Sequence, residues 1–221
     1  MPAFIAFDLD GVLYSAERFL GEAYREAIAQ VNERHPGAVP RVPTTREVLD
    51  HVGWPVPVIL QRLFPSVDLK AMELLYDQTL PVICAHVRRR EGQLFPGVPE
   101  TLTDLRTRGY LLGVASNGRR PYIDAVLDTY ELRACFVELV AVESGSKTTK
   151  SDILRAYAGR HAPARVLMVG DRASDLEAAR DVGSLFVGCD YGHGYRHEID
   201  GAGPVISSFV ELPRAIRGLG L

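Results

Sequence analysis

The pattern of hydrophobic and polar residues changes twice along the chain. Residues 4–7, Phe-Ile-Ala-Phe, are a short continuous apolar run, which predicts a strand buried on both faces of a sheet. From residue 15 to about residue 90, apolar residues recur at steps of three and four, the spacing of amphipathic helices. From Phe95 onward, short apolar runs alternate with helical segments. The pattern therefore predicts a helical block inserted into a strand–helix fold.

Four helices are predicted in the inserted block. The first covers Glu17–Arg34, the second is short and begins at Thr44, and the third begins after Pro57. The fourth has the longest apolar stripe, over Leu69–Val87, and Pro81 within that stripe should kink it.

The rest of the chain predicts an α/β fold with a doubly wound parallel sheet. Strands are predicted at Phe4–Phe7, Leu111–Ala115, Leu139–Val142, Val166–Val169, Leu185–Val187 and Val205–Ile206. Helices are predicted at Pro99–Arg108, Pro121–Leu127, Ser151–Ala158, Ser174–Val182 and Phe209–Arg217. Because the first strand joins this sheet, we expect residues 1–14 and 91–221 to form one catalytic core and residues 15–90 an inserted helical domain.

Polar residues cluster where the predicted strands end. Asp8-Leu9-Asp10-Gly11 follows the first strand, Ser116-Asn117-Gly118 follows the strand at Leu111–Ala115, and Gly170-Asp171 is followed closely by Asp175. Lys150 stands directly before a predicted helix. Ligands of open parallel sheets bind at the carboxyl ends of the strands, so we expect these groups to share one site.

These residue types suit phosphoryl transfer. Two carboxylates two residues apart repel each other unless a cation neutralises them, and hard oxygen ligands from Asp8, Asp171 and a backbone carbonyl suit Mg²⁺. One carboxylate can attack phosphorus and form an aspartyl-phosphate, while a second carboxyl group transfers protons. Hydroxyl and backbone donors of Ser116-Asn117, with an ammonium group, can stabilise the phosphoryl charge.

In the same order along the chain, these four clusters resemble the motifs of the haloacid dehalogenase superfamily. The inserted helices resemble that superfamily's α-helical cap. The stretch from Val187-Gly188 through Tyr191-Gly192-His193-Gly194 to Ala202-Gly203-Pro204 most resembles its phosphoglycolate phosphatase branch. The resemblance implies a Mg²⁺-dependent phosphatase that acts on a small phosphorylated metabolite, with phosphoglycolate as the suspected substrate.

The resemblance also implies a role for each residue. Asp8 would be the nucleophile and a metal ligand, and Asp10 would be the acid/base and give its backbone carbonyl to the metal. The other implied roles are phosphate binding by Ser116 and Asn117, charge neutralisation by Lys150, metal binding by Asp171, and support of the metal's waters or of the lysine by Asp175.

Three points stay open at this level. Lys147 competes with Lys150 as the phosphate-contacting lysine, although Lys150 is favoured by its position before a helix. Val12 stands where many such phosphatases have threonine, which leaves a β-phosphoglucomutase-like reaction possible. Trp54, the single tryptophan, fits packing within the inserted domain and substrate selection equally well.

Other classes of protein fit the sequence less well. A phospho-acceptor signalling domain shares the aspartates and the lysine but has no use for an inserted block of helices. The net charge of −3 does not suggest binding to nucleic acid or to an anionic membrane. No secretory signal or membrane-spanning apolar stretch is found, and the three cysteines form no CxxC pair, so we expect a cytoplasmic protein with reduced thiols. A monomer or a small homo-oligomer is expected.

Overall fold

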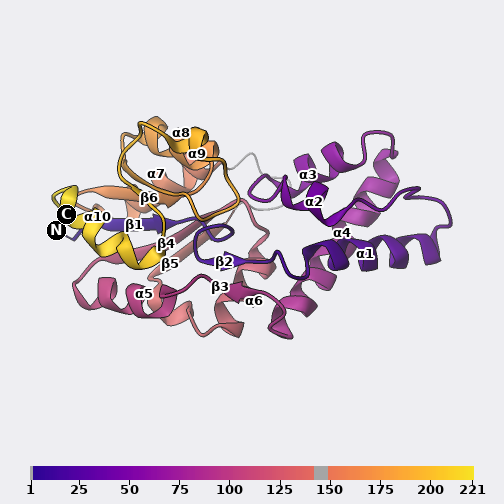
Figure 1. Cartoon of the computed structure of the whole chain (residues 1–221), viewed down its shortest axis with the longest axis horizontal. Coiled ribbons are helices and arrows are strands. Elements are labelled where there is room, and N and C mark those ends of the chain that lie inside the picture. Colours follow the sequence, from indigo (N-terminus) through magenta and orange to yellow (C-terminus); the bar gives the residue numbers. More distant parts are fainter. Residues whose placement is uncertain (1, 142–148) are drawn as a thin grey trace.

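The computed structural model describes residues 2–141 and 149–221 of the chain. Figure 1 shows two parts: a layered part containing the sheet, and a helical part at the opposite end from the two termini. Within the described residues, no helix has the length and apolar character needed to cross a membrane.

The main sheet confirms the predicted fold class. Six parallel strands have the order β5-β4-β1-β6-β7-β8. Their bounds are β1 Phe4–Phe7, β4 Leu111–Ser116, β5 Glu138–Ala141, β6 Val166–Gly170, β7 Leu185–Cys189 and β8 Val205–Ile206. Because all six run in the same direction, their carboxyl ends lie along one edge of the sheet.

The apolar run of β1 is buried between two layers of helices. Its residues are completely buried, and successive side chains point to opposite faces of the sheet. Phe4 and Ala6 join one hydrophobic cluster, whereas Ile5 and Phe7 join the other. The helices of this part are α5 Val98–Thr107, α6 Arg120–Thr129, α7 Lys150–His161, α8 Ala173–Val182, α9 Arg196–Ile199 and α10 Leu212–Gly218.

The inserted block contains the four expected helices: α1 Leu20–Arg34, α2 Thr45–Leu49, α3 Val56–Leu63 and α4 Leu69–Arg88. α1 begins three residues later than predicted, because residues 17–19 form a turn. Thr44 caps α2 by accepting the backbone N–H of Glu47 at 3.2 Å. α4 continues through Pro81 as a single helix.

The two connections between the parts pair with each other, a feature that the sequence pattern did not predict. β2 (Tyr14–Ser15) and β3 (Gln93–Leu94) form an antiparallel ribbon (Figure 1). The Tyr130 hydroxyl donates to the Gly92 carbonyl at 2.6 Å. A Cβ atom at Gly92 would lie 2.0 Å from the Tyr14 hydroxyl and 2.8 Å from the Ser15 carbonyl oxygen, so glycine allows the ribbon to pack closely.

We expect Gly92→Ala to lower the free energy of unfolding by about 1–3 kcal/mol, since the added methyl group overpacks this ribbon. The matched control is Gly159→Ala, because Gly159 is exposed in α7 and a Cβ there would meet no atom within 4 Å. This control should stabilise the protein by about 0.5–1 kcal/mol. Urea unfolding of both variants tests the prediction, and equal stability of the two would contradict it.

Candidate active site

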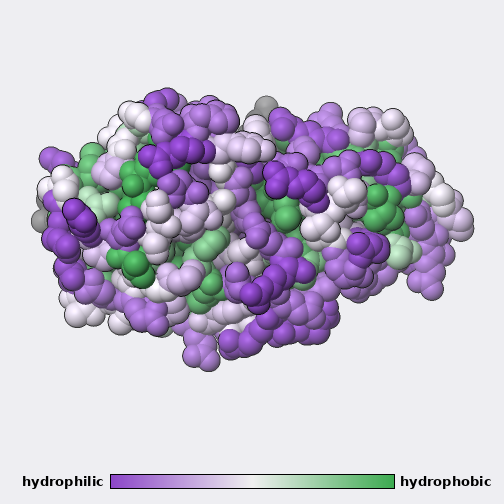
Figure 2. All heavy atoms as spheres, viewed as in Figure 1, coloured by the Kyte–Doolittle hydropathy of each residue, from purple (hydrophilic) through white to green (hydrophobic). Residues whose placement is uncertain are grey.

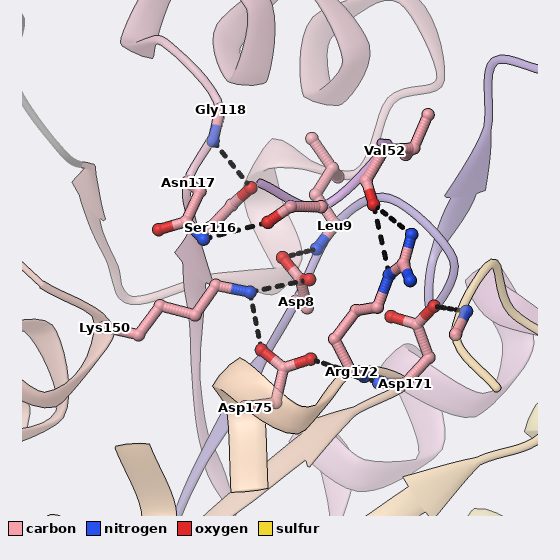
Figure 3. A network of polar contacts seen from close by, with 12 residues as sticks. Asp8, Leu9, Val52, Ser116, Asn117, Gly118, Lys150, Asp171, Arg172 and Asp175 are labelled. Carbon is pink, nitrogen blue, oxygen red and sulfur yellow. Dashed lines mark hydrogen bonds and ion pairs between the residues drawn. The ribbon is translucent and has the colours of Figure 1, made fainter. Parts of the chain in front are cut away.

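The polar groups that follow the strands come together at the carboxyl edge of the sheet. Asp8 follows β1, Ser116 ends β4, Asp171 follows β6, and Lys150 begins α7. Figure 3 shows these residues converging from different elements, with Asp175 of α8 beside them. Each of these five side chains is buried.

Three carboxylates and one ammonium group lie together at the centre of the site. Oxygen atoms of Asp8, Asp171 and Asp175 lie within 4.8 Å of one another. The Lys150 Nζ atom lies 2.7 Å from Asp8 Oδ2 and 2.5 Å from Asp175 Oδ1 (Figure 3). The cluster therefore carries more negative than positive charge when its carboxyl groups are ionised.

The pKa values of the cluster reflect this imbalance. Burial is the main cause that raises the pKa of Asp8, and it raises the pKa of Asp175 to about 6. Burial, followed by the charge of Asp175, raises the pKa of Asp171 to about 6. Burial opposes the charge on Lys150, but the two neighbouring carboxylates outweigh it and raise the pKa of the ammonium group.

Asp171 is held by a loop that follows β7. Its Oδ2 atom accepts the backbone N–H groups of His193 at 2.7 Å and Gly194 at 2.9 Å. A Cβ at Gly194 would lie 1.8 Å from the Asp171 carbonyl oxygen, and one at Gly11, whose φ is +82°, would lie 2.3 Å from Oδ2. The glycines in this part of the chain therefore let the backbone approach the carboxylate.

The buried carboxylates fit a hard divalent cation. Asp171 Oδ1 is buried and has no hydrogen-bond partner among the described residues. Asp175 is less available, because its oxygens accept from Lys150 and from the backbone N–H groups of Asp171 and Arg172. Oxygen ligands of this kind suit Mg²⁺, and Asp8 and Asp171 have the carboxylates best placed to bind it.

Asp10 receives a hydrogen bond that the sequence did not predict. The Tyr122 hydroxyl, from α6, donates to Asp10 Oδ1 at 2.5 Å, although the two residues are 112 positions apart. Burial raises the pKa of Asp10 to about 7, and this hydrogen bond opposes the rise. Val12 has no hydroxyl group where many phosphatases of this kind have a threonine. Here the hydroxyl group near Asp10 comes from Tyr122.

The loop after β4 forms one hydrogen bond within itself and another to a turn of the inserted block. Ser116 Oγ accepts the backbone N–H of Gly118 at 3.1 Å. The Asn117 amide, however, donates to the carbonyl oxygen of Gly53 at 2.9 Å. In this conformation Asn117 therefore binds the inserted domain through its side chain.

Arg172 is a second link to the inserted domain, and sequence reasoning missed it. Its guanidinium group donates to the Val52 carbonyl at 2.6 Å and 3.1 Å, and to the Asp50 carbonyl at 3.4 Å. The side chain is buried between the two parts (Figure 3). Arg172 lies between two predicted site residues, but nothing in its position indicates a partner 120 residues away.

Lys150 and Lys147 are the two candidates for the phosphate-contacting lysine. Lys150 contacts Asp8 and Asp175, as described above. Lys147 lies outside the described residues.

Comparison with known proteins identifies the family. The family model of haloacid dehalogenase-like hydrolases matches residues 3–183. The chain belongs to the haloacid dehalogenase-like hydrolases. This confirms the resemblance seen in the four sequence clusters, and with it the expectation of an enzyme.

Relatives of this hydrolase extend along nearly its whole length. A phosphoglycolate phosphatase of Haemophilus influenzae (strain 86-028NP) is 27% identical over 220 residues, covering 94% of this chain and 95% of that protein. A phosphoglycolate phosphatase of Caulobacter vibrioides is 30% identical over 228 residues, covering 96% of this chain and 90% of that protein.

Solved structures show the same fold. A predicted phosphoglycolate phosphatase from Haemophilus somnus 129pt has a TM-score of 0.83 at 23% identity, with 96% of each chain covered. CbbY from Rhodobacter sphaeroides in complex with phosphate has a TM-score of 0.82 at 20% identity, with 100% of each chain covered.

The raised pKa of Asp10 predicts how this hydrolase responds to pH without metal. The pKa is about 7 in the folded protein, against an ordinary value of 3.8. Stability from the protonated carboxyl is therefore fully present below about pH 4 and is lost as the pH rises through about 7. The Asp10→Asn side chain is neutral at every pH. The free energy of unfolding of this variant should therefore exceed that of the wild type by about 2–4 kcal/mol at pH 8 and equal it near pH 4.

Urea unfolding in EDTA at both pH values measures this difference. Asp77→Asn, which removes an exposed carboxyl group of α4, is the control and should behave as the wild type does at both pH values. A difference between Asp10→Asn and wild type that is the same at pH 4 and pH 8 would contradict the prediction.

Proposed function

We propose that this hydrolase is a Mg²⁺-dependent phosphatase that cleaves a small phosphate monoester through an aspartyl-phosphate on Asp8. The observation that carries the proposal is the buried cluster of Asp8, Asp171 and Lys150, with Asp8 at the floor of a cleft that Asp10 and Ser116 also line. Nucleophile, proton donor and phosphate-binding groups thus face one space. The proposed residue roles are those that the family resemblance implies.

Asp8, Asp171 and the backbone carbonyl of Asp10 would hold the metal ion. When bound, Mg²⁺ neutralises the carboxylates and polarises the phosphate oxygens. The excess negative charge of the cluster supports this assignment, as does Asp171 Oδ1, which has no hydrogen-bond partner in the part of the chain that the structure describes.

The protein's own groups orient the nucleophile and the phosphate. The Leu9 N–H donates to Asp8 Oδ1 at 2.8 Å, so the carboxylate is held at one oxygen while Lys150 contacts the other. Asp8 attacks phosphorus, the bond to the alcohol breaks, and the phosphoryl group passes to the carboxylate. The Lys150 ammonium and the Ser116 loop stabilise the charge on the phosphoryl oxygens.

Asp10 then carries the protons of both steps. It gives a proton to the departing alcohol and takes one from the water that hydrolyses the aspartyl-phosphate. A pKa of about 7 suits a group that must act as an acid and then as a base near neutral pH. The Tyr122 hydroxyl contacts the carboxyl group, which supports a hydrolase over the β-phosphoglucomutase-like reaction that Val12 leaves possible.

Residues 15–90 act as a cap in this proposal. Asn117 and Arg172 bind the cap segment at residues 50–53, which supports a closed state that limits the access of water. The ribbon of β2 and β3 is the connection about which the cap would move.

The full-length relatives are named phosphoglycolate phosphatases, so phosphoglycolate is the reference substrate against which other phosphate esters are compared. The described cysteines are all free, which supports the expected cytoplasmic location.

Asp8→Asn should abolish turnover without unfolding the protein. The amide is close in size to the carboxylate but cannot attack phosphorus as an anion, and Lys150 keeps its contact with Asp175. Phosphate release and circular dichroism measure the two effects, with Asp77→Asn as the active control. If a folded Asp8→Asn variant keeps more than a few per cent of the activity, Asp8 is not the nucleophile.

Activity should require Mg²⁺ and be inhibited by Ca²⁺. Mg²⁺ enforces octahedral geometry, whereas the larger coordination shell of Ca²⁺ lets both oxygens of a carboxylate bind the metal and so withdraws the nucleophile. Rates in EDTA, and after each ion is added back, measure this requirement. Full activity in EDTA would refute the metal's role.

Tyr122→Phe should reduce kcat/KM by about tenfold or more for an alkyl phosphate, whose alcohol needs a proton from Asp10. The loss should be smaller for p-nitrophenyl phosphate, because its phenolate leaves without a proton. Tyr130→Phe, which loses a hydroxyl hydrogen bond at the ribbon, is the control. Equal losses on both substrates would indicate that Tyr122 stabilises the fold and does not position Asp10.

A further inference from the structure

The cleft between the cap and the core is polar at its floor and apolar on its cap side. Asp8, Asp10 and Ser116 line the floor. The cap contributes a wall of aliphatic side chains, and these are Leu20, Val48, Val52, Val56, Ile59, Leu80 and Ile83. The cavity volume is about 90 Å³, so it admits a small group beside the phosphate.

The outer surface of the molecule is less uniformly apolar than the cap side of the cleft. Figure 2 shows apolar surface in separated areas of the visible face, one of them where the cap meets the core, with hydrophilic residues over much of the rest. The apolar wall lines the same cleft as Asp8 and Asp10, where it would face the alcohol portion of a bound phosphate ester.

The described residues that line the cleft offer little positive charge to bind a substrate carboxylate. Arg119 is the one cationic residue among the described residues that line the cleft. Its guanidinium group donates to the Tyr76 carbonyl at 2.7 Å and lies over the Tyr76 ring at 4.0 Å. Among the described residues that line the cleft, no other cation is present, so a substrate carboxylate would have to displace these contacts or be buried beside no lining cation, and burial of an unpaired charge is strongly unfavourable.

Among the described residues on the cap side of the cleft, the neutral polar side chains are Tyr24, Trp54 and Thr79. The Thr79 hydroxyl donates to the Tyr76 carbonyl at 3.1 Å, and the Asn117 amide donates to Gly53. The hydroxyl of the buried Tyr24 forms no hydrogen bond with the described residues, so it could bind one polar atom of a ligand. A sugar phosphate would bring several hydroxyl groups to this wall and leave most of them unpaired.

We propose that the alcohol portion of the substrate is uncharged and largely apolar: a short branched alkyl group or a single aromatic ring, with at most one polar atom near Tyr24. This inference rests on the proposed phosphatase function and refines its substrate class. It sets the enzyme apart from relatives named for phosphoglycolate, whose alcohol portion carries a carboxylate.

The test compares phosphates of primary alcohols with the wild-type enzyme and Mg²⁺. The apolar members are benzyl phosphate and isobutyl phosphate, and the polar members are phosphoglycolate and glycerol 1-phosphate. We expect kcat/KM to be at least about tenfold higher for the apolar pair, since a single methylene in an apolar pocket changes it by about 10–200-fold. Equal or higher values for phosphoglycolate or glycerol 1-phosphate would overturn the proposal.

The same series separates this inference from the proposed function. If no member of the series and no p-nitrophenyl phosphate releases phosphate, the phosphatase proposal itself fails. If the polar members are the better substrates, the enzyme is a phosphatase and only the apolar class is wrong.

A variant tests the wall directly. Ile83→Lys places an ammonium group on the cap side of the cleft and should raise the ratio of kcat/KM for phosphoglycolate to that for benzyl phosphate by about tenfold or more. Val42→Lys, at an exposed apolar position that does not line the cleft, should leave the ratio unchanged. An unchanged ratio in folded Ile83→Lys would contradict the proposal, and if that variant fails to fold, the wild-type series decides.

Discussion

The contact between Lys150 and the carboxylates of Asp8 and Asp175 brings together residues from three different elements of the core. These ionised groups are removed from water, and a third carboxylate, that of Asp171, adds further negative charge. Such a cluster is unfavourable unless hydrogen bonds and opposite charge compensate each group. The N–H groups at residues 193 and 194, and the glycines that let them approach, provide part of that compensation. The remaining negative charge is what makes the site attractive to a divalent cation.

Much of this arrangement could be predicted from sequence, because it depends on local pattern. The apolar run of β1 and the polar residues directly after it indicate a buried strand whose end carries chemistry. The same holds for Ser116 after β4 and Asp171 after β6. Parallel strands bring such residues to a common edge without further information.

The remaining contacts depend on tertiary packing that no local pattern records. Tyr122 reaches Asp10 and Arg172 reaches Val52 across more than a hundred residues of sequence. β2 and β3 are two residues long each, which is too short for an alternating pattern. From the sequence, Val12 leaves Asp10 without the hydroxyl group that a threonine would provide. In the folded chain, the Tyr122 hydroxyl donates to Asp10. The apolar wall of the cleft likewise forms only when side chains from all four inserted helices come together.

We propose that the phosphoryl group passes through Asp8, and this is tested by trapping the phosphorylated enzyme during turnover. The enzyme is mixed with saturating benzyl phosphate and Mg²⁺ and quenched in acid during turnover. It is then digested, and the masses of its peptides are measured by mass spectrometry. We expect a phosphoryl group on the peptide that contains Asp8, removable by hydroxylamine as an acyl phosphate and absent from Asp8→Asn. A phosphoryl group on another residue, or an Asp8 peptide that stays unmodified while phosphate is released, would contradict it.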